Sequence, residues 1–269
     1  MKFALNYSPE AAALLNEKLI DIDLYKCADW DDMIATASQQ RPIYVHFPLI
    51  TAYGREYDLE RIAKLRAQTQ THYVNMHIAA RASLFNMSID ATDKSHADSL
   101  TKAILDDVQK VTARFGSENV ILENVPWDPD YEIPLLVMMP QFIRQIIETG
   151  GCGLLLDLSH ALIAASRLNM DVADYLAQLP TDRLRELHVT GVYDDNGYLR
   201  DHFPMTTEDW ALFERAMEHI HADAWRTPEI VACEYGGIGP MFEWRSKREV
   251  IAVEVPRMLD TVRASVPTK

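Results

Sequence analysis

The sequence has little that would indicate a disulfide framework, a membrane span or a nucleotide-binding loop. Its three cysteines, Cys27, Cys152 and Cys233, are far apart and form no CxxC pair, which predicts reduced thiols in an intracellular, cytoplasmic protein. No apolar run is long enough to cross a bilayer, and residues 1–10 contain no sustained apolar segment of a signal peptide. No GxGxxG follows the first expected strand and no phosphate loop is present, which disfavours a doubly wound nucleotide-binding sheet.

Basic residues are also scarce relative to acidic ones, since 26 Lys and Arg face 40 Asp and Glu, a net charge of −14. Affinity for nucleic acid depends on cationic side chains that neutralise phosphates, so this balance disfavours a nucleic-acid partner as well as a membrane surface. The 269 residues suffice for a sizeable core, and we predict one domain over residues 1–269.

Short apolar segments alternate with helical segments about eight times along the chain, which is typical of parallel βαβ units. The expected strands are 3–6, 22–25, 43–47, 73–78, 120–125, 154–158, 187–192 and 230–234. The expected helices are 9–19, a helix capped by Asp29 or Asp31 that runs to Ala37, 58–70, 95–114, 140–148, 161–179 with a break near Asn169, a helix capped by Thr206 or Thr207 that runs to Ile220, and 247–264. Eight such units in this length predict an α/β fold of the (β/α)8 TIM-barrel type.

Most of these apolar runs end in an ionisable side chain. The strand-end residues are His46, His77, Glu123, Asp157, His188 and Glu234. His160 follows Asp157 by three residues, and Asp201 and His202 lie in an expected polar loop after the seventh strand. Because the carboxyl ends of barrel strands face one mouth, we expect these side chains to converge there.

Imidazoles and carboxylates without thiolates form a ligand set for iron, zinc, manganese or cobalt. Carboxylates can bridge two ions, so this many groups could hold two or three metal ions. The candidate metal ligands are His46, His77, Glu123, Asp157, His160, His188, Asp201, His202 and Glu234, of which Glu123, Glu234 and His160 are also the candidate catalytic residues.

Each of these residues also has a purely structural interpretation. Asp157 could cap a helix, Glu123 and Glu234 could form ion pairs, and His46 could be a hydrogen-bonded core histidine. Asp201 and His202 could equally be surface groups. We assign no role to His72, His96, His219 and His221, which we expect at the surface.

The order of Glu123, Asp157, His188 and Glu234 on strands five to eight resembles the xylose-isomerase-like barrel superfamily of sugar isomerases, epimerases and endonuclease IV. The segment Leu156-Asp157-Leu158-Ser159-His160 is similar to the Asp-x-x-His signature after strand six in that superfamily. With His46 and His77 added, the set is similar to the multinuclear members, which include endonuclease IV with three zinc ions and the non-heme iron-dependent oxidases of the methanobactin-biosynthesis type, which modify cysteines in peptides. The segments Tyr44-Val45-His46-Phe47-Pro48 and Glu186-Leu187-His188-Val189-Thr190-Gly191 make the chain more similar to the oxidases.

Two departures from those oxidases are visible. They typically carry Asp-x-His after strand seven, whereas Asp201 and His202 are adjacent here, and they commonly have Asn at the position of His160. The resemblance implies an iron enzyme that oxidatively modifies a peptide or small molecule. The alternatives are a sugar isomerase or epimerase with one divalent ion, an endonuclease IV-like zinc phosphodiesterase, and a non-catalytic barrel that sequesters a metal or a ligand.

Two long connections are candidates for closing over a substrate. They are the segments 81–93 and 127–131, each of which follows an expected strand. Arg81 in the first segment is available to bind a substrate carboxylate, although a solvated arginine is the structural alternative.

Overall fold

The computed structural model describes residues 1–92, 94–239 and 242–264 of the chain. Asp93, at the end of the first expected substrate loop, lies outside these ranges. The chain divides into two compact units, which we describe separately. Unit 1 comprises residues 1–46, 65–71 and 185–269, and unit 2 comprises residues 47–64 and 72–184. The single-domain organisation stays a prediction.

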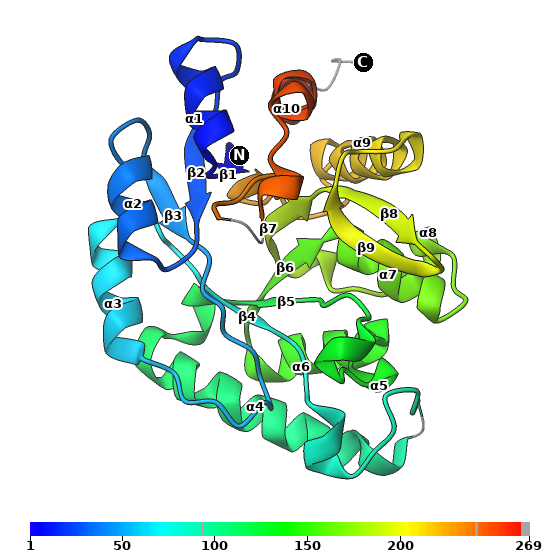
Figure 1. The fold of residues 1–269 in the computed structure, drawn as a ribbon. Coiled ribbons are helices and arrows are strands. Elements are labelled where there is room, and N and C mark those ends of the chain that lie inside the picture. Colours follow the sequence, from blue (N-terminus) through cyan, green and yellow to red (C-terminus); the bar gives the residue numbers. More distant parts are fainter. Residues whose placement is uncertain (93, 240–241, 265–269) are drawn as a thin grey trace. The chain divides into compact units, whose positions relative to one another are not determined.

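Unit 1 contains five parallel strands in the order β3-β2-β1-β10-β7 (Figure 1). The bounds are β1 Lys2–Asn6, β2 Leu24–Cys27, β3 Ile43–Val45, β7 Leu184–Val189 and β10 Ile230–Cys233. The helices of this unit are α1 Pro9–Asn16, α2 Asp31–Ala37, α9 Thr207–His221 and α10 Arg248–Arg263. Ser8 caps α1 and a Thr206–Asp209 capping box starts α9, as helix-start signals predict.

Unit 2 contains three parallel strands in the order β6-β5-β4. The strands are β4 Val74–His77, β5 Val120–Glu123 and β6 Gly153–Asp157, and the helices are α4 Ala97–Phe115, α5 Leu135–Met138, α6 Pro140–Gly150, α7 Leu158–Arg167 and α8 Val172–Ala177. Helix α3, Leu59–Gln68, is shared between the two units. Helices α4 and α6 lie side by side in Figure 1 and bury Ile104, Val108, Ile143 and Ile147.

The ends of the strands in unit 2 are in register. His77 is paired with Glu123 as the last residue of β4 and of β5, and Asp157 is the last residue of β6. The expected helix 161–179 is broken as predicted, because α7 ends at Arg167 and α8 starts at Val172. It begins earlier than expected, at Leu158, because the carboxylate of Asp157 caps it.

The prediction for the second strand was wrong by two residues. The apolar residues Ile22 and Leu24 suggested a strand over 22–25, but β2 runs from Leu24 to Cys27. Lys26 is therefore a strand residue, and it is buried. None of the helices within the described ranges is both long and apolar enough to span a membrane.

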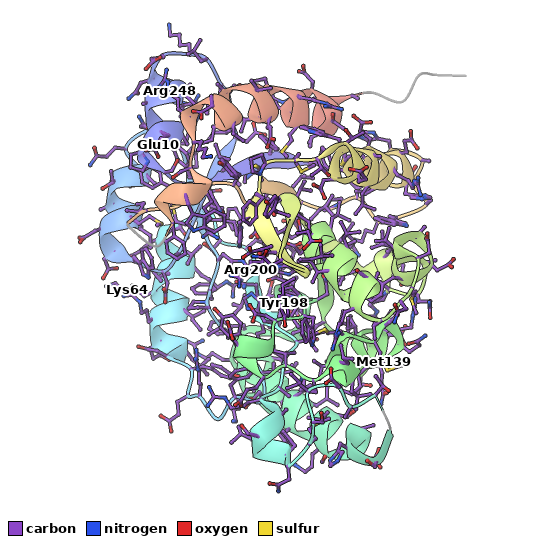
Figure 2. All side chains as sticks on the ribbon, turned by 45° about the vertical axis from the view of Figure 1, so that its right-hand side comes forward. Glu10, Lys64, Met139, Tyr198, Arg200 and Arg248 are labelled. Carbon is purple, nitrogen blue, oxygen red and sulfur yellow. The ribbon has the colours of Figure 1, made fainter. Side chains whose placement is uncertain are left out.

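The expected polar loop after the seventh strand is instead a two-stranded antiparallel hairpin of β8, Gly191–Asp195, and β9, Tyr198–Phe203. Asn196 and Gly197 form its turn with φ of 57° and 89°, the left-handed conformation that two-residue hairpin turns require. Figure 2 shows Tyr198 and Arg200 on this hairpin. The hairpin explains why Asp201 and His202 lie on a strand and not in an irregular loop.

Candidate metal centre

Four of the predicted residues form a buried carboxylate–imidazole cluster in unit 2, and we call it cluster A: His77, Glu123, Asp157 and His160. Nε2 of His77 lies 3.2 Å from Oε2 of Glu123, and Nδ1 of His160 lies 3.5 Å from Oε1 of the same carboxylate. Nε2 of His160 lies 3.8 Å from Oδ2 of Asp157. Glu123 and Asp157 are 1% and 0% exposed, so both carboxylates are removed from bulk water.

Asp157 has a structural role and retains a ligand atom. Its Oδ1 accepts the backbone N–H of His160 at 2.8 Å, which is the helix-cap alternative considered for this residue. Its Oδ2 is buried and, among the residues that the structure describes, has no hydrogen-bond partner. A buried carboxylate oxygen without a donor is costly, so this atom is suited to a cation.

Asn124, which the sequence analysis did not single out, fixes the position of Asp157. Its side-chain amide donates to the carbonyl of Asp157 and accepts the N–H of Asp157, both at 2.9 Å. The carbonyl of Asn124 lies 2.8 Å from Nδ1 of His160. Because a carbonyl can only accept, Nδ1 carries the proton and Nε2 keeps its lone pair when this imidazole is neutral.

His77 is oriented in the same way. Its Nδ1 lies 2.9 Å from the carbonyl oxygen of Leu49, which leaves Nε2 directed at Glu123. Backbone carbonyls that hold the far nitrogen of an imidazole are a common feature of metal-ligating histidines. Ligand atoms of Glu123, Asp157 and His160 all lie within 4.8 Å of one another, so these three residues could hold one metal ion.

A second group of predicted residues lies together in unit 1, and we call it cluster B: His46, His188, His202 and Glu234. Nδ1 of His188 lies 2.9 Å from Oε1 of Glu234. The rings of His46 and His188 are 5.3 Å apart between centroids. Nδ1 of His202 lies 3.9 Å from Oε2 of Glu234 and 3.1 Å from the carbonyl of Glu234.

The imidazole of His188 is held from its other side by Glu186, which the sequence analysis also missed. Nε2 of His188 lies 2.7 Å from Oε1 of Glu186, and the hydroxyl of Tyr44 donates to the same oxygen at 2.8 Å. Residues two apart on a strand share a face, so Glu186 and His188 point to the same side of β7. That spacing was the available sequence signal for Glu186.

His202, the last residue but one of β9, adopts an unusual backbone conformation with φ of 62°. Its N–H donates to Oγ1 of Thr190 at 3.2 Å, which helps to hold this left-handed residue in place. Non-glycine residues in this region cluster at functional sites, so the strain supports a role for His202. Oδ2 of Asp201 lies 3.6 Å from Nε2 of His202, so both residues remain candidates.

Lys26 is an unpredicted member of the surroundings of cluster B. Its ammonium contacts Oε1 of Glu234. Within the part of the chain that the structure describes, it is the only lysine or arginine that is buried. The thiols flanking this region are poor ligands, because burial raises the pKa of Cys27 and Cys233 to about 12 and keeps both protonated.

The two expected substrate loops make contacts within unit 2. Arg81 is half-exposed, lies over the ring of Tyr53 at 5.3 Å and places Nε 3.8 Å from Oε2 of Glu132. Its role as a carboxylate receptor stays a prediction. Trp127, in the second loop, carries the guanidinium of Arg167 over its ring at 4.1 Å.

The two units thus each bring predicted ligands together. The convergence of all nine residues on one mouth stays a prediction. His72 and His219 are exposed, as expected, and stack on neighbouring aromatic rings.

Solved structures of other proteins are similar to this chain over nearly its whole length. A xylose isomerase domain containing protein from Salmonella typhimurium is similar with a TM-score of 0.58 at 13% identity, covering 98% of this chain and 97% of that one. Endonuclease IV from Thermus thermophilus is similar with a TM-score of 0.55 at 13% identity, covering 97% and 99%. These similarities confirm the predicted α/β class and the (β/α)8 TIM-barrel fold.

Sequence comparison gives the family. A UPF0276 protein of Acaryochloris marina is 24% identical over 167 residues, which are 60% of this chain and 59% of the relative. The chain therefore matches about three fifths of that relative's length. The family model described as RiPP precursor modification enzyme MbnB/TglH/ChrH matches residues 55–226, which include seven of the nine predicted ligands, all except His46 and Glu234. The resemblance inferred from the strand-end motifs is confirmed, and this chain belongs to the MbnB/TglH/ChrH family of RiPP precursor modification enzymes.

Proposed function

We propose that this protein is a multinuclear metal-dependent enzyme, with iron as its metal, that oxidatively modifies a peptide or small-molecule substrate. The observation that carries the proposal is the buried carboxylate oxygen Oδ2 of Asp157 in cluster A. Glu123 and Asp157 are both buried and lie beside two imidazoles, and Oδ2 of Asp157 has no hydrogen-bond donor among the described residues. A buried carboxylate oxygen without a donor is disfavoured by roughly several kcal/mol unless a metal or proton compensates it.

The donor atoms of cluster A fit a first-row ion. Ligand atoms about 2.1 Å from an ion lie at most roughly 4.2 Å apart. The ligand atoms of Glu123, Asp157 and His160 all lie within 4.8 Å of one another, so a bound ion would need only small side-chain shifts. Oδ2 of Asp157 is the ligand atom best suited to a metal, because it has no hydrogen-bond partner among the described residues.

The kind of ligand favours iron and an oxidation. Imidazole with carboxylate, and no thiolate, is the set found in non-heme iron oxygenases, although zinc and manganese accept it as well. A bound iron would supply one-electron chemistry and Lewis acidity at coordination positions that the protein leaves open. Membership of a family of precursor-modification enzymes supports a peptide as the substrate.

Neighbouring carbonyls and side chains would orient the metal-ligating imidazoles before a metal binds. The carbonyls of Asn124 and Leu49 hold Nδ1 of His160 and His77, so both Nε2 atoms are presented with a lone pair. In cluster B, Glu186 and Tyr44 hold the far side of His188 while Nδ1 faces Glu234. Each cluster therefore has its own orienting contacts.

Metal analysis of protein purified without oxygen and without chelators tests the proposal. Two or three irons per chain are expected, together with oxygen consumption when a thiol-containing peptide is added. Asp157→Asn should lose iron, whereas the matched control Asp171→Asn should keep it, because Asp171 also caps a helix but is exposed. One manganese or cobalt per chain would favour the isomerase, three zincs would favour the phosphodiesterase, and either result would overturn the oxidase.

A further inference from the structure

Arg245, which the sequence analysis did not single out, carries an unused hydrogen-bond donor in unit 1. Its Nε is buried and has no hydrogen-bond partner among the described residues. Burial lowers the pKa of this guanidinium to about 10, and the carboxylate of Asp201 opposes the shift, so the group stays charged at neutral pH. A buried donor on a charged group is costly without an acceptor, so Nε is suited to an anionic ligand.

The guanidinium of Arg245 is held in place by its surroundings. Its central carbon, Cζ, lies 4.3 Å from the centroid of the Phe242 ring. A Cβ atom added to Gly237 would lie 2.5 Å from Cβ of Phe242 and 3.4 Å from Nε of Arg245, so the glycine backbone packs directly against both side chains. An arginine that is fixed in this way loses little side-chain entropy when it binds a ligand.

Arg245 lies beside residues of cluster B. Gly237 follows Glu234 by three residues in the connection that leaves β10. Asp201, whose charge acts on Arg245, places Oδ2 3.6 Å from Nε2 of His202. An anion bound by Arg245 would therefore lie close to candidate metal ligands of unit 1.

Exposed aromatic side chains lie around this guanidinium. Phe242, which it covers, lies 6.4 Å from Trp30 between ring centroids, and Trp30 is 47% exposed. Trp244 is 45% exposed and lies 4.8 Å from the ring of Phe203. Aromatic rings beside one cation suit a peptide with an apolar body and one carboxylate. A phosphate, with its second negative charge, is disfavoured by the neighbouring carboxylate of Asp201.

We propose that Arg245 binds a carboxylate of the peptide substrate and positions the peptide beside cluster B. The inference rests on the proposed function, because it assumes a peptide substrate. The carboxylate belongs either to an acidic side chain or to the C-terminus of the peptide, and a planar guanidinium binds both in the same bidentate geometry. The competing explanation is that Arg245 merely packs on Phe242.

Isothermal titration calorimetry of the metal-free full chain in chelator separates the two explanations. The probes are the peptide Gly-Tyr-Gly-Asn-Gly with both ends blocked, the same blocked peptide with Asp in place of Asn, and the Asn peptide with a free C-terminal carboxylate. The wild type should bind at least one charged peptide about ten- to a hundredfold more tightly than the neutral peptide, because hydrogen bonds to charged groups are strong. The charged peptide that it prefers identifies the source of the carboxylate.

Arg245→Gln should abolish this preference and leave the affinity for the neutral peptide unchanged, whereas lost packing alone would weaken the binding of all three peptides alike. Arg245→Lys should keep a reduced preference, because an ammonium replaces the planar fork. Arg257→Gln is the matched control and should behave as the wild type. Arg257 also lies over an aromatic ring, that of Trp210 at 3.8 Å, but its guanidinium is paired with Glu214.

Three results would overturn the inference: equal binding of the three peptides by the wild type, binding of none of them, or an unchanged preference in Arg245→Gln. If Arg245→Gln does not fold, Arg245→Lys takes its place, and a preference equal to that of the wild type would overturn the inference there. The titration needs no metal. A protein that prefers the charged peptides but binds no iron would therefore refute the proposed oxidase and leave the carboxylate site standing.

Discussion

Replacing Asp157 by Asn separates the two roles that the structure gives this side chain. Oδ1 caps α7 and Oδ2 is a candidate ligand without a described hydrogen-bond donor. Asn and Asp are nearly equivalent as helix caps, so Asp157→Asn should preserve the cap and remove the charge. Asp157→Ala removes both and should cost about 1 kcal/mol more through the lost cap.

The charge term can be estimated from the geometry. Ligand atoms of Glu123 and Asp157 lie within 4.8 Å, and two unit charges at that distance repel by roughly 3.5 kcal/mol at an effective dielectric of about 20. We therefore expect metal-free Asp157→Asn to be at least as stable as the wild type, with a gain of up to roughly 3 kcal/mol if both carboxylates are ionised in the wild type.

With metal the order should reverse. At a metal concentration of about 100 times the dissociation constant, binding stabilises the wild type by roughly 2.7 kcal/mol. If the variant binds about 100-fold more weakly, the same concentration stabilises it by only roughly 0.4 kcal/mol. Denaturant unfolding with chelator and with iron measures both terms. A variant that is destabilised without metal, and still gains as much from iron as the wild type, would refute the assignment of Oδ2 as a ligand.

Three further variants test other parts of the structure. Glu254 accepts the N–H of Met205, and burial raises the pKa of its carboxyl group to about 7. The free energy of unfolding should therefore fall by up to roughly 3 kcal/mol as pH rises from about 4.5 to 7. Glu254→Gln should flatten this pH dependence when it is measured in chelator, and an unchanged pH dependence would contradict the assignment to Glu254. Asn124→Ala should cost about 2–4 kcal/mol in unfolding, because two backbone groups of Asp157 lose their partners, and should weaken iron binding; normal iron binding would exclude a positioning role. Tyr44→Phe should cost about 1.5–3 kcal/mol, because the buried carboxylate of Glu186 loses a donor, and a cost near zero would show that another donor replaces it.

The candidate site was predictable where a charged residue ends an apolar run. His77, Glu123 and Asp157 were found this way, because their strands are short, apolar and followed by clear breaks. The parallel fold was predictable for the same reason. Strand ends are the part of a barrel where sequence periodicity and function coincide.

The missed residues lie where local signals mislead. Lys26 was placed outside its strand, because a lysine after an apolar segment usually marks the end of a strand. The sequence did not show that it is paired, because its partner Glu234 is 208 positions away. Asn124 directly follows Glu123, and the sequence analysis singled out only the charged residue of this pair. The hairpin had a usable signal, since Asn196-Gly197 is a favoured two-residue turn, but the exposed polar residues around it favoured a loop.

Burial of charge, more than the identity of the residues, separates a metal site from an ion-pair network in this molecule. Glu234, with Lys26 against it, would look the same in a protein that binds no metal, because the pair compensates itself. Asp157 is different, because its Oδ2 is buried and has no hydrogen-bond partner among the described residues, and a bound cation is the compensation that we propose for it. A bound iron should therefore stabilise the wild type against denaturant and should stabilise Asp157→Asn less, and equal stabilisation of both would assign Asp157 to the ion-pair network.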